Sequence, residues 1–347
     1  YAASWAGGLR RFDYLLDNPS WEIIPLPLDT LDNLYCDLID VDNYELNPRD
    51  PSDGGNHNHK GFSVLGTDDF LWVGTAHGIN RGTINNDCIN WDHQTTNHGL
   101  SGNWVVGIEE QLLDDLHRVW AITWSAGSGE FNSVSYTEDY GVNWQDIEYF
   151  TSLNIKIYNL DFDGEKIYVA SEEGLFYSDD LIHWEKISRS WADSNTGDLA
   201  LDKTVYSVLS KNDLFIGTGD GLVYHNTISN ENTLYRFWNN SVKSNSEDSL
   251  FSVYPNPFFV SENGIINGDG HVRFIYYNSN NLKSKINIYD FTMQHVVRLL
   301  EHINIENESV VIWDGRNKLG NRVVNGTYFC KLEIDNQIYW TKLLVIN

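Results

Sequence analysis

The sequence has few basic residues and no clusters of them, which excludes one large class of ligand. Lysine and arginine together number 23, against 49 aspartates and glutamates, so the formal net charge is −26. Proteins that bind nucleic acid through its phosphates need lysine and arginine grouped on one surface. Nucleic acid is therefore not expected as a partner.

Long apolar runs and paired cysteine motifs are also missing. No stretch approaches the roughly 18–20 apolar residues that a membrane helix needs, so no transmembrane segment is predicted. The three cysteines, Cys36, Cys88 and Cys330, are too few and too scattered for a disulfide framework or a zinc site of the CxxC type. One pair plus a free thiol, or three thiols, are both open. Apolar residues make up 41% and aromatic residues 14% of the chain, enough to bury a core.

Charge divides the chain at about residue 250. Residues 251–347 contain 9 acidic and 9 basic side chains, which leaves 40 acidic and 14 basic residues, and hence the whole net charge of −26, in residues 1–250. The polar stretch 239–250 suits an exposed connector. We predict a first domain over residues 1–240, a linker over 241–250 and a second domain over 251–347.

The first domain contains a repeat built around a glycine turn. The copies are LWVGTAHGIN (71–80), IYVASEEGLFYS (167–178) and LFIGTGDGLVYH (214–225), with a degenerate copy, ASWAGGLRRF, at 3–12. Each copy has a strand of β-branched or aromatic residues, a turn of small residues with glycine at a fixed place, and a second short strand. The aligned glycines are Gly8, Gly78, Gly174 and Gly221.

The spacing of these glycines indicates a period of about 48 residues. Gly174 and Gly221 are 47 residues apart, and Gly78 and Gly174 are 96 apart, which leaves room for one altered copy at 117–137. Gly8 and Gly78 are 70 apart, one period plus an insertion within residues 30–60. Another strand precedes each hairpin, and four short strands per unit is the pattern of a β-propeller blade.

Five blades are predicted, centred near residues 1–28, 61–96, 105–150, 157–190 and 205–238. The first lacks its innermost strand. Either another part of the chain supplies that strand to a five-bladed ring, or upstream blades complete a larger ring; we favour the second, because the chain begins in mid-repeat. Helical periodicity is absent except in residues 106–118, for which we expect a strand and a polar hairpin turn.

A second motif follows the outer strand of three blades. YTEDYGVNW (136–144) places Thr137, Asp139, Gly141 and Trp144 in the order S/T-x-D-x-G-x-x-W. Such a motif forms a turn in which the carboxylate caps backbone N–H groups, glycine takes a positive φ and tryptophan packs between sheets. The related copies SDDLIHW and NNDCINW supply Asp179 and Trp184, and Asn86 and Trp91. These positions are predicted to be structural.

The two motifs carry a resemblance to known propellers. LWVGTAHGIN and LFIGTGDGL resemble blades of two-component-regulator-type propellers, and TEDYGVNW is similar to the Asp-box of sialidase-, sortilin- and photosystem-assembly-factor-like propellers. The resemblance covers most of residues 1–240 and implies an all-β propeller. It implies no particular function, because propellers of this kind host many activities.

Residues 251–347 alternate apolar and polar side chains over seven short strands. The strands are FSVYPNPF (251–258), HVRFIYY (271–277), KINIYDF (285–291), HVVRLL (295–300), SVVIWDG (309–315), GTYFCKLEI (326–334) and IYWTKLLVI (338–346). Seven short strands in about 97 residues predict an Ig-like β-sandwich. In WDGRN (313–317), we expect Asp314 and Asn317 to cap backbone groups and Gly315 to take a positive φ.

The order of motifs in this domain is similar to that of two known families. YPNPF (254–258), IYD (288–290), WDGRN followed by Gly320, and NGTY (325–328) resemble the Ig-like domain of the flagellar hook-cap scaffold protein. The last two strands are also similar to the C-terminal sorting domains of type IX secretion. The departure is Thr292-Met293-Gln294, where the family usually has a turn with glycine. The resemblance implies export across an outer membrane, then release or surface attachment.

Residues 30–60 hold the candidate metal ligands. Acidic residues there could supply the several oxygen ligands that Ca²⁺ requires, although their order does not fit an EF-hand loop: Asp37, Asp40, Asp42, Asp50 and Asp53. His57 and His59 would face the same way on a strand and could bind a transition metal. A solvated loop is the alternative for both sets. Because loops on a rigid scaffold carry function, we expect specificity to reside in this insertion.

No set of residues converges on a catalytic site. Sialidases need an arginine cluster to bind the substrate carboxylate, and none of the arginines before residue 240 lies in a sialidase motif. A glycosidase needs two opposed carboxylates, but 40 acidic residues before residue 250 offer no basis for choosing a pair. Four tryptophans could stack sugars, although most are expected in blade cores: Trp104, Trp120, Trp124 and Trp238.

These observations favour a secreted or surface-displayed protein of an outer-membrane bacterium. Its propeller would bind a glycan or a protein partner, and its Ig-like domain would serve secretion, attachment or assembly. A polysaccharide-active enzyme, either a glycoside hydrolase or a lyase, is the first alternative. The second is a subunit of a surface layer or extracellular filament, in which exposed domains pair edge strands between copies.

Overall fold

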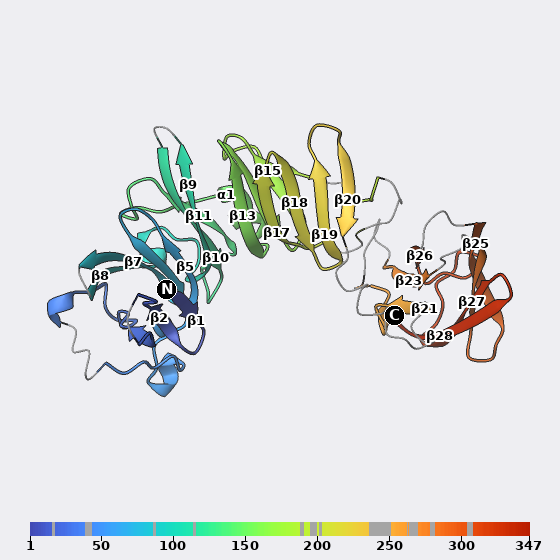
Figure 1. Cartoon of the computed structure of the whole chain (residues 1–347). Coiled ribbons are helices and arrows are strands. Elements are labelled where there is room, and N and C mark those ends of the chain that lie inside the picture. Colours follow the sequence, from blue (N-terminus) through green and yellow to red (C-terminus); the bar gives the residue numbers. More distant parts are fainter. Residues whose placement is uncertain are drawn as a thin grey trace. The chain divides into compact units, whose positions relative to one another are not determined.

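The structure, a computed structural model, is almost entirely β (Figure 1). It describes residues 1–15, 18–38, 44–85, 88–113, 116–187, 191–194, 200, 203–235, 251–261, 263, 270–277, 282–303 and 308–347. The chain divides into two compact units. The first contains residues 1–188 and 204–216, and the second contains residues 189–203 and 217–347. The all-β prediction is confirmed. The predicted linker, 241–250, lies outside the described residues.

Five successive sheets before residue 236 correspond to the five predicted blades. Within each sheet the strands follow chain order, as in a propeller blade, and the second sheet gains β4 beside its outer strand. The sheets are β1 (Ala2–Ser4), β2 (Gly8–Phe12) and β3 (Trp21–Ile24); β5 (Gly61–Gly66), β6 (Leu71–Thr75), β7 (Gly78–Asn85) and β8 (Cys88–Gln94) with β4 (Asn33–Leu34); β9 (Trp104–Leu113), β10 (Leu116–Trp124), β11 (Ser133–Thr137) and β12 (Gln145–Asp146); β13 (Ile157–Asp163), β14 (Lys166–Ser171), β15 (Gly174–Ser178) and β16 (Glu185–Lys186); and β17 (Val205–Lys211), β18 (Asp213–Thr218), β19 (Gly221–Asn226) and β20 (Glu231–Tyr235).

Helices are few and short in the described part of the chain. They are α1 (Glu148–Leu153) and the 3-10 turns η1 (Cys36–Leu38), η3 (Pro51–Asp53), η4 (His57–His59) and η5 (Thr96–His98). Residues 106–113 and 116–118 lie in the paired strands β9 and β10, so the strand prediction for this segment is confirmed. None of the described helices is long and apolar enough to cross a membrane.

The turn between the second and third strand of a blade has the same chemistry in several copies. Gly78, Gly174 and Gly221 have φ of 94°, 121° and 136°, which glycine adopts without a Cβ penalty. At Gly78 a Cβ would also come within 2.0 Å of the carbonyl oxygen of Gln94. The predicted role of these aligned glycines as turn residues is confirmed.

A hydroxyl closes each of these turns from the end of the second strand. Thr75 donates to the Gly78 carbonyl over 3.1 Å, Ser171 to Gly174 over 2.9 Å, and Thr218 to Gly221 over 3.0 Å. Each hydroxyl also accepts the backbone N–H two residues later. Ser/Thr turns of this kind satisfy backbone groups that a tight reversal would leave unpaired.

Apolar side chains fill the spaces between neighbouring sheets of the first unit. One cluster joins the first and second sheets through Leu9, Ile24 and Trp91. Another joins the second and third sheets through Trp72 and Trp144. A third, with Trp120 and Phe150, joins the sheets of β9–β12 and β13–β16. Packing of successive sheets through their faces is the core expected of propeller blades.

The insertion is held to the second blade by a disulfide. Cys36 in η1 is bonded to Cys88 at the start of β8, with 52 residues between them in sequence. Cys330, in contrast, is a buried free thiol. The sequence left the pairing open, and the structure resolves it as one pair plus a free cysteine. A bridge over a loop of this length stabilises the fold by restricting the unfolded chain.

The C-terminal residues form a β-sandwich of two sheets, coloured orange to red in Figure 1. One sheet has the order β21-β23-β26 and the other β22-β28-β27-β24-β25. Side chains of both sheets make one core that includes Phe251, Phe274, Trp313, Leu332 and Leu343. The strands are β21 (Phe251–Tyr254), β22 (Phe258–Phe259), β23 (Val272–Tyr277), β24 (Lys283–Tyr289), β25 (His295–Ile303), β26 (Glu308–Trp313), β27 (Gly326–Ile334) and β28 (Gln337–Ile346).

The two polar motifs of the sandwich are turns. Asp314 accepts the Arg316 N–H over 3.0 Å, Asn317 accepts those of Leu319 and Asn321, and Gly315 has a φ of 71°. In the turn after β24, Met293 adopts a φ of 65°. This left-handed conformation explains why glycine is usual in the resembling families at the place where this chain has Thr292-Met293-Gln294.

A buried ion pair links the sandwich to the glycine turn before β19, within the second unit. The Arg273 Nη1 and Nη2 atoms of β23 lie 3.1 and 2.8 Å from the two carboxylate oxygens of Asp220. Arg273 is 1% exposed and Asp220 6%. This bidentate geometry is the strong form of an arginine–carboxylate contact. Each residue compensates the buried charge of the other, so loss of either one is destabilising.

Replacing Arg273 with methionine should therefore destabilise the second unit. Arg273→Met leaves the Asp220 carboxylate buried without its counter-charge, which typically costs about 3–5 kcal/mol. Urea unfolding should show this loss, whereas Arg298→Met, at an exposed arginine of the same sandwich, should change the free energy of unfolding by less than about 0.5 kcal/mol. Equal losses in the two variants would contradict the assignment of Arg273 as the buried link.

Candidate functional site

The first of the motifs that resemble an Asp-box is a closed turn between β11 and β12, and we call the turns formed by these motifs Asp-box turns. Asp139 accepts the backbone N–H of Asn143 over 2.9 Å and the Thr137 hydroxyl over 2.8 Å. Thr137 in turn accepts the N–H of Gly141, whose φ is 83°. Trp144 is buried and donates its indole N–H to Gln94 of the neighbouring sheet over 2.8 Å. Every polar group of the motif is thus used within the fold.

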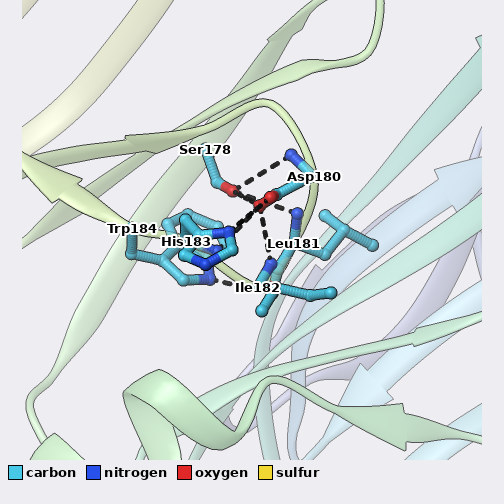
Figure 2. A network of polar contacts seen from close by, with 6 residues as sticks. All are labelled: Ser178, Asp180, Leu181, Ile182, His183 and Trp184. Atoms are coloured by element: carbon cyan, nitrogen blue, oxygen red, sulfur yellow. Dashed lines mark hydrogen bonds and ion pairs between the residues drawn. The ribbon is translucent and has the colours of Figure 1, made fainter.

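The second Asp-box, between β15 and β16, uses a different aspartate from the one predicted (Figure 2). Asp180 accepts the N–H groups of Ile182 and His183 over 2.9 and 2.7 Å, and it also contacts the Ser178 hydroxyl. Asp179 is exposed and lies 3.5 Å from Lys166. The assignment of Asp179 is therefore corrected to Asp180, which has the serine two residues before it, as Asp139 has Thr137.

Electrostatics around this second turn follow from its hydrogen bonds. The His183 ring and the two backbone N–H groups hold the pKa of Asp180 well below its usual range, and the same contact raises the pKa of His183. Trp184 donates its indole N–H to the Leu181 carbonyl over 3.1 Å. In the third copy, Trp91 is buried within β8, and Asn86 lies outside the described residues.

The predicted transition-metal pair His57 and His59 is wrong. Both residues lie on the 3-10 turn η4 and not on a strand. His59 is fully buried, with Nδ1 accepting the Asn47 N–H over 3.0 Å and Nε2 3.2 Å from the Tyr44 hydroxyl. Burial lowers the pKa of His59, so a neutral ring with both nitrogens engaged holds two parts of the insertion, η4 and residues 44–47, together.

The predicted calcium ligands do not form a cluster in the described structure. Asp50 caps η3 by accepting the Ser52 N–H over 2.9 Å, and Asp53 is exposed. Asp40 and Asp42 lie outside the described residues. Among the residues that are described, no group of three or more histidine, cysteine or acidic side chains could hold a metal ion.

Aromatic side chains gather instead where the first strand of each blade begins. In β5 and β13 the second residue, Phe62 or Tyr158, is the extra residue of a β-bulge. Tyr206 is the second residue of β17, and Trp104 is the first of β9. A bulge redirects the side chain that it carries. The same local irregularity therefore redirects an aromatic ring at the start of β5 and of β13.

These rings and two turn tryptophans make a surface that we call the aromatic rim. Around Trp5, ring centroids lie 5.1 Å away at Phe62 and 5.9 Å away at Trp104. Tyr158 lies 5.8 Å from Trp124 and 5.1 Å from Tyr206. Trp5 and Tyr206 are 51% and 49% exposed. The rim comprises Trp5, Phe62, Trp104, Trp124, Tyr158 and Tyr206.

Two lysines occupy equivalent places beside the rim. Lys60 and Lys156 each precede a first strand, and their Nζ atoms lie 5.4 Å from the ring of Trp5 and 5.2 Å from that of Trp124. The carbonyl of each accepts a backbone N–H from the glycine turn, Ala76 over 3.1 Å and Glu172 over 3.0 Å. The turn thus fixes the start of the first strand, and with it the rim.

The tryptophans predicted as sugar-stacking candidates make up only part of this surface. Trp104 and Trp124 belong to it, Trp120 is core at 1% exposure, and Trp238 lies outside the described residues. The signal that could have revealed the rest was spacing from the glycine turn. Phe62 and Tyr158 each lie 16 residues before their turn glycine, and Tyr206 lies 15 before its own.

A second feature of the first strands is a pair of carboxyl groups between blades. Glu109 of β9 and Asp161 of β13 occupy the same place in the repeat, four residues beyond Val105 and Ile157. Burial, with a smaller contribution from the charge of Asp161, raises the pKa of Glu109 to about 7. Asp161 accepts the backbone N–H of Ser210 in the next first strand, so one member of the pair is structural.

No protein-family model and no curated protein matches this chain. Among solved structures, PorZ, a surface component of the type IX secretion system of Porphyromonas gingivalis, aligns at 15% identity and a TM-score of 0.42, over 99% of this chain and 50% of that one. The chain thus spans about half the length of that structure.

Two further structures show the range of similar proteins. The extracellular domain of a putative hybrid two-component system from B. thetaiotaomicron aligns at 13% identity, with a TM-score of 0.41, over 82% of this chain and 44% of that one. An ancestral GH74 enzyme aligns at 13% identity, with a TM-score of 0.38, over 81% and 36%. Likeness at this level assigns no function, which is argued below from the residues of the chain itself.

Glu109 predicts a specific pH dependence of stability. Its folded pKa of about 7 lies above the ordinary value of 4.5, so the folded state binds more protons than the unfolded state between these values. Its contribution to stability is then present at low pH and is lost as the pH rises through about 7. Glu109→Gln should raise the melting temperature relative to wild type at pH 8 and not at pH 4. A stabilisation independent of pH would contradict the assignment.

Proposed function

We propose that this is an extracellular or cell-surface binding protein whose propeller-type unit binds a glycan chain on the aromatic rim. The observation that carries the proposal is the recurrence of aromatic rings at one end of successive first strands. Rings that only packed the core would be buried, whereas Trp5 and Tyr206 remain about half exposed. The row of rings is therefore accessible as a binding surface.

Sugar rings fit such a surface for a physical reason. Their C–H faces are apolar and pack flat on an aromatic ring, whereas their hydroxyl groups need hydrogen-bond partners at the edges. Lys60 and Lys156 provide donors beside Trp5 and Trp124. Trp124 is also held in place, because its indole N–H donates to the Ile157 carbonyl over 2.8 Å. Rings fixed before binding lose little entropy on association.

The C-terminal sandwich is proposed to serve secretion, attachment or assembly. Support comes from its WDGRN motif, since Asp314 caps the turn and Gly315 takes the positive φ that the sequence predicts. The Ig-like assignment of its two sheets is part of this proposal. The Cys36–Cys88 disulfide supports an oxidising, and hence extracellular, location.

A polysaccharide-active enzyme remains the second candidate, and one observation favours it. Glu109, with a pKa raised to about 7 by burial and by Asp161, has the protonation behaviour of a general acid, which glycosidases pair with a second carboxylate. In such an enzyme, Glu109→Gln would abolish the release of sugar products while leaving rim binding intact.

A glycan-array screen of the intact chain, with and without Ca²⁺, tests the binding proposal. Trp5→Ala and Tyr206→Ala should each weaken binding about tenfold or more, roughly 1.4 kcal/mol, because exposed aromatic anchors dominate such surfaces. Trp21→Ala is the matched control, since Trp21 is 53% exposed on β3 and is not part of the rim.

Binding that survives both rim substitutions, or that falls equally in the Trp21 control, would contradict the rim as the site. Mass spectrometry of the glycans after incubation separates binding from turnover. Unchanged masses support the binding protein, and cleaved products that vanish with Glu109→Gln would favour the enzyme.

A further inference from the structure

The outer face of the five-stranded sheet of the sandwich is both basic and aromatic. In β27 the side chains alternate between buried and partly exposed, and in β28 Ile338, Trp340, Lys342 and Leu344 are exposed. The register places Trp340 beside Lys331, and Phe329 beside Lys342 and Tyr289. We call this surface the basic-aromatic face; it comprises Lys285, Tyr289, Arg298, Phe329, Lys331, Trp340 and Lys342.

Trp340 lies at the centre of this face. It is 47% exposed, its ring centroid is 5.8 Å from that of Tyr289, and the Lys331 Nζ lies 5.8 Å above it. Beside it is a shallow pocket of about 320 Å³, lined by Met293, Phe329, Trp340, Thr341 and Lys342. Such a pocket accepts one apolar side chain of a partner.

The basic character of the face is visible around Glu333, a carboxylate of β27 that Lys331 contacts. The hydrogen bond from Lys331, with further attraction from Lys285 and Arg298, lowers the pKa of Glu333. Three cations thus act on the Glu333 carboxylate, in a domain whose net charge is zero. A partner for this face should carry an exposed apolar side chain flanked by carboxylates.

The blades of the same chain present that pattern at the end opposite the aromatic rim. First strands begin at the rim and end in a hairpin, and third strands end in an Asp-box turn, so both kinds of turn share the far end. Exposed acids occupy these turns in successive blades: Asp68, Asp69, Glu138, Asp163, Glu165 and Asp179.

The Asp-box turn between β15 and β16 has the best match to the pocket. Ile182 is 74% exposed, and its side chain points away from the hydrogen-bond network that shapes the turn (Figure 2). Asp179, three residues earlier, has a 65% exposed side chain. The turn itself is rigid because Asp180 and Ser178 use the intervening backbone N–H groups.

We propose that copies of this chain associate head to tail, with the Asp-box turn at 178–184 of one copy seated on the basic-aromatic face of the next. Ile182 enters the pocket beside Trp340, and Asp179 faces Lys342. Two different surfaces meet, so the contact is heterologous. The net charge of −26 on each copy opposes association at long range. Salt at about 0.15 M screens this repulsion beyond about 8 Å. The oppositely charged groups of the proposed contact lie closer together than that, so their attraction is retained.

Light scattering across a concentration series at about 0.15 M salt tests this contact. The intact chain should show a mass that rises with concentration. Trp340→Ser and Ile182→Ser should each leave a monomer, because each removes one half of the apolar anchor. Ile228→Ser is the matched control: Ile228 is 95% exposed on a different turn, and its loss should leave association unchanged.

Mixing the two deficient variants separates head-to-tail association from other modes. The Ile182→Ser chain keeps an intact face and the Trp340→Ser chain an intact turn, so the mixture should form a species of twice the monomer mass and grow no further. Wild type that stays monomeric at its highest soluble concentration overturns the proposal. Self-association of either variant at the wild-type level also overturns it.

A charge exchange tests the pairing of Asp179 with Lys342. Lys342→Glu and Asp179→Lys should each weaken self-association at least about fivefold, since like charges then meet in the contact. An equimolar mixture of the two should recover a mixed dimer through the reversed pair. Failure of the mixture to associate would overturn this pairing. Because neither substitution touches the rim, glycan binding should be unchanged in both.

Discussion

The turn between the second and third strands of each blade is the constraint on which the rest of the first unit depends. Glycine at positive φ makes the reversal, a serine or threonine hydroxyl closes it, and its backbone N–H then binds the carbonyl just before the first strand, as Ala76 does at Lys60. The turn therefore sets where the first strand starts. In β5 and β13 a bulge follows and directs the aromatic ring, so this part of the aromatic rim is a consequence of repeated backbone geometry.

The sequence could predict the turns and strands that depend on interactions between neighbouring residues. The aligned glycines, the paired strands of residues 106–118 and the strands of the sandwich were all visible in short-range patterns, because strand alternation and turn residues act within a few positions. Spacing from the tryptophan points to Asp179, because Asp179 and Trp184 are as far apart as Asp139 and Trp144. The hydrogen bonds show that Asp180, one residue closer to the tryptophan, caps the turn.

The candidate site could not be predicted in the same way, because it is assembled across blades. Phe62, Tyr158 and Tyr206 lie 48 or more residues apart, and each alone looks like an ordinary strand residue. The histidines of the insertion failed as metal ligands for a similar reason. Whether His59 faces solvent or Tyr44 depends on how the insertion folds back on the blade, which a spacing of two residues does not encode.

One repeat thus produces two ends of different chemistry, aromatic where first strands begin and acidic where they finish. The central claim is that the aromatic end is the binding surface. Hydrogen–deuterium exchange of the intact chain with a bound glycan tests it most directly. The account predicts slowed exchange at the starts of β5, β9, β13 and β17, and no change at the Asp-box turns. Protection confined to the Asp-box turns, with the strand starts unaffected, would contradict it.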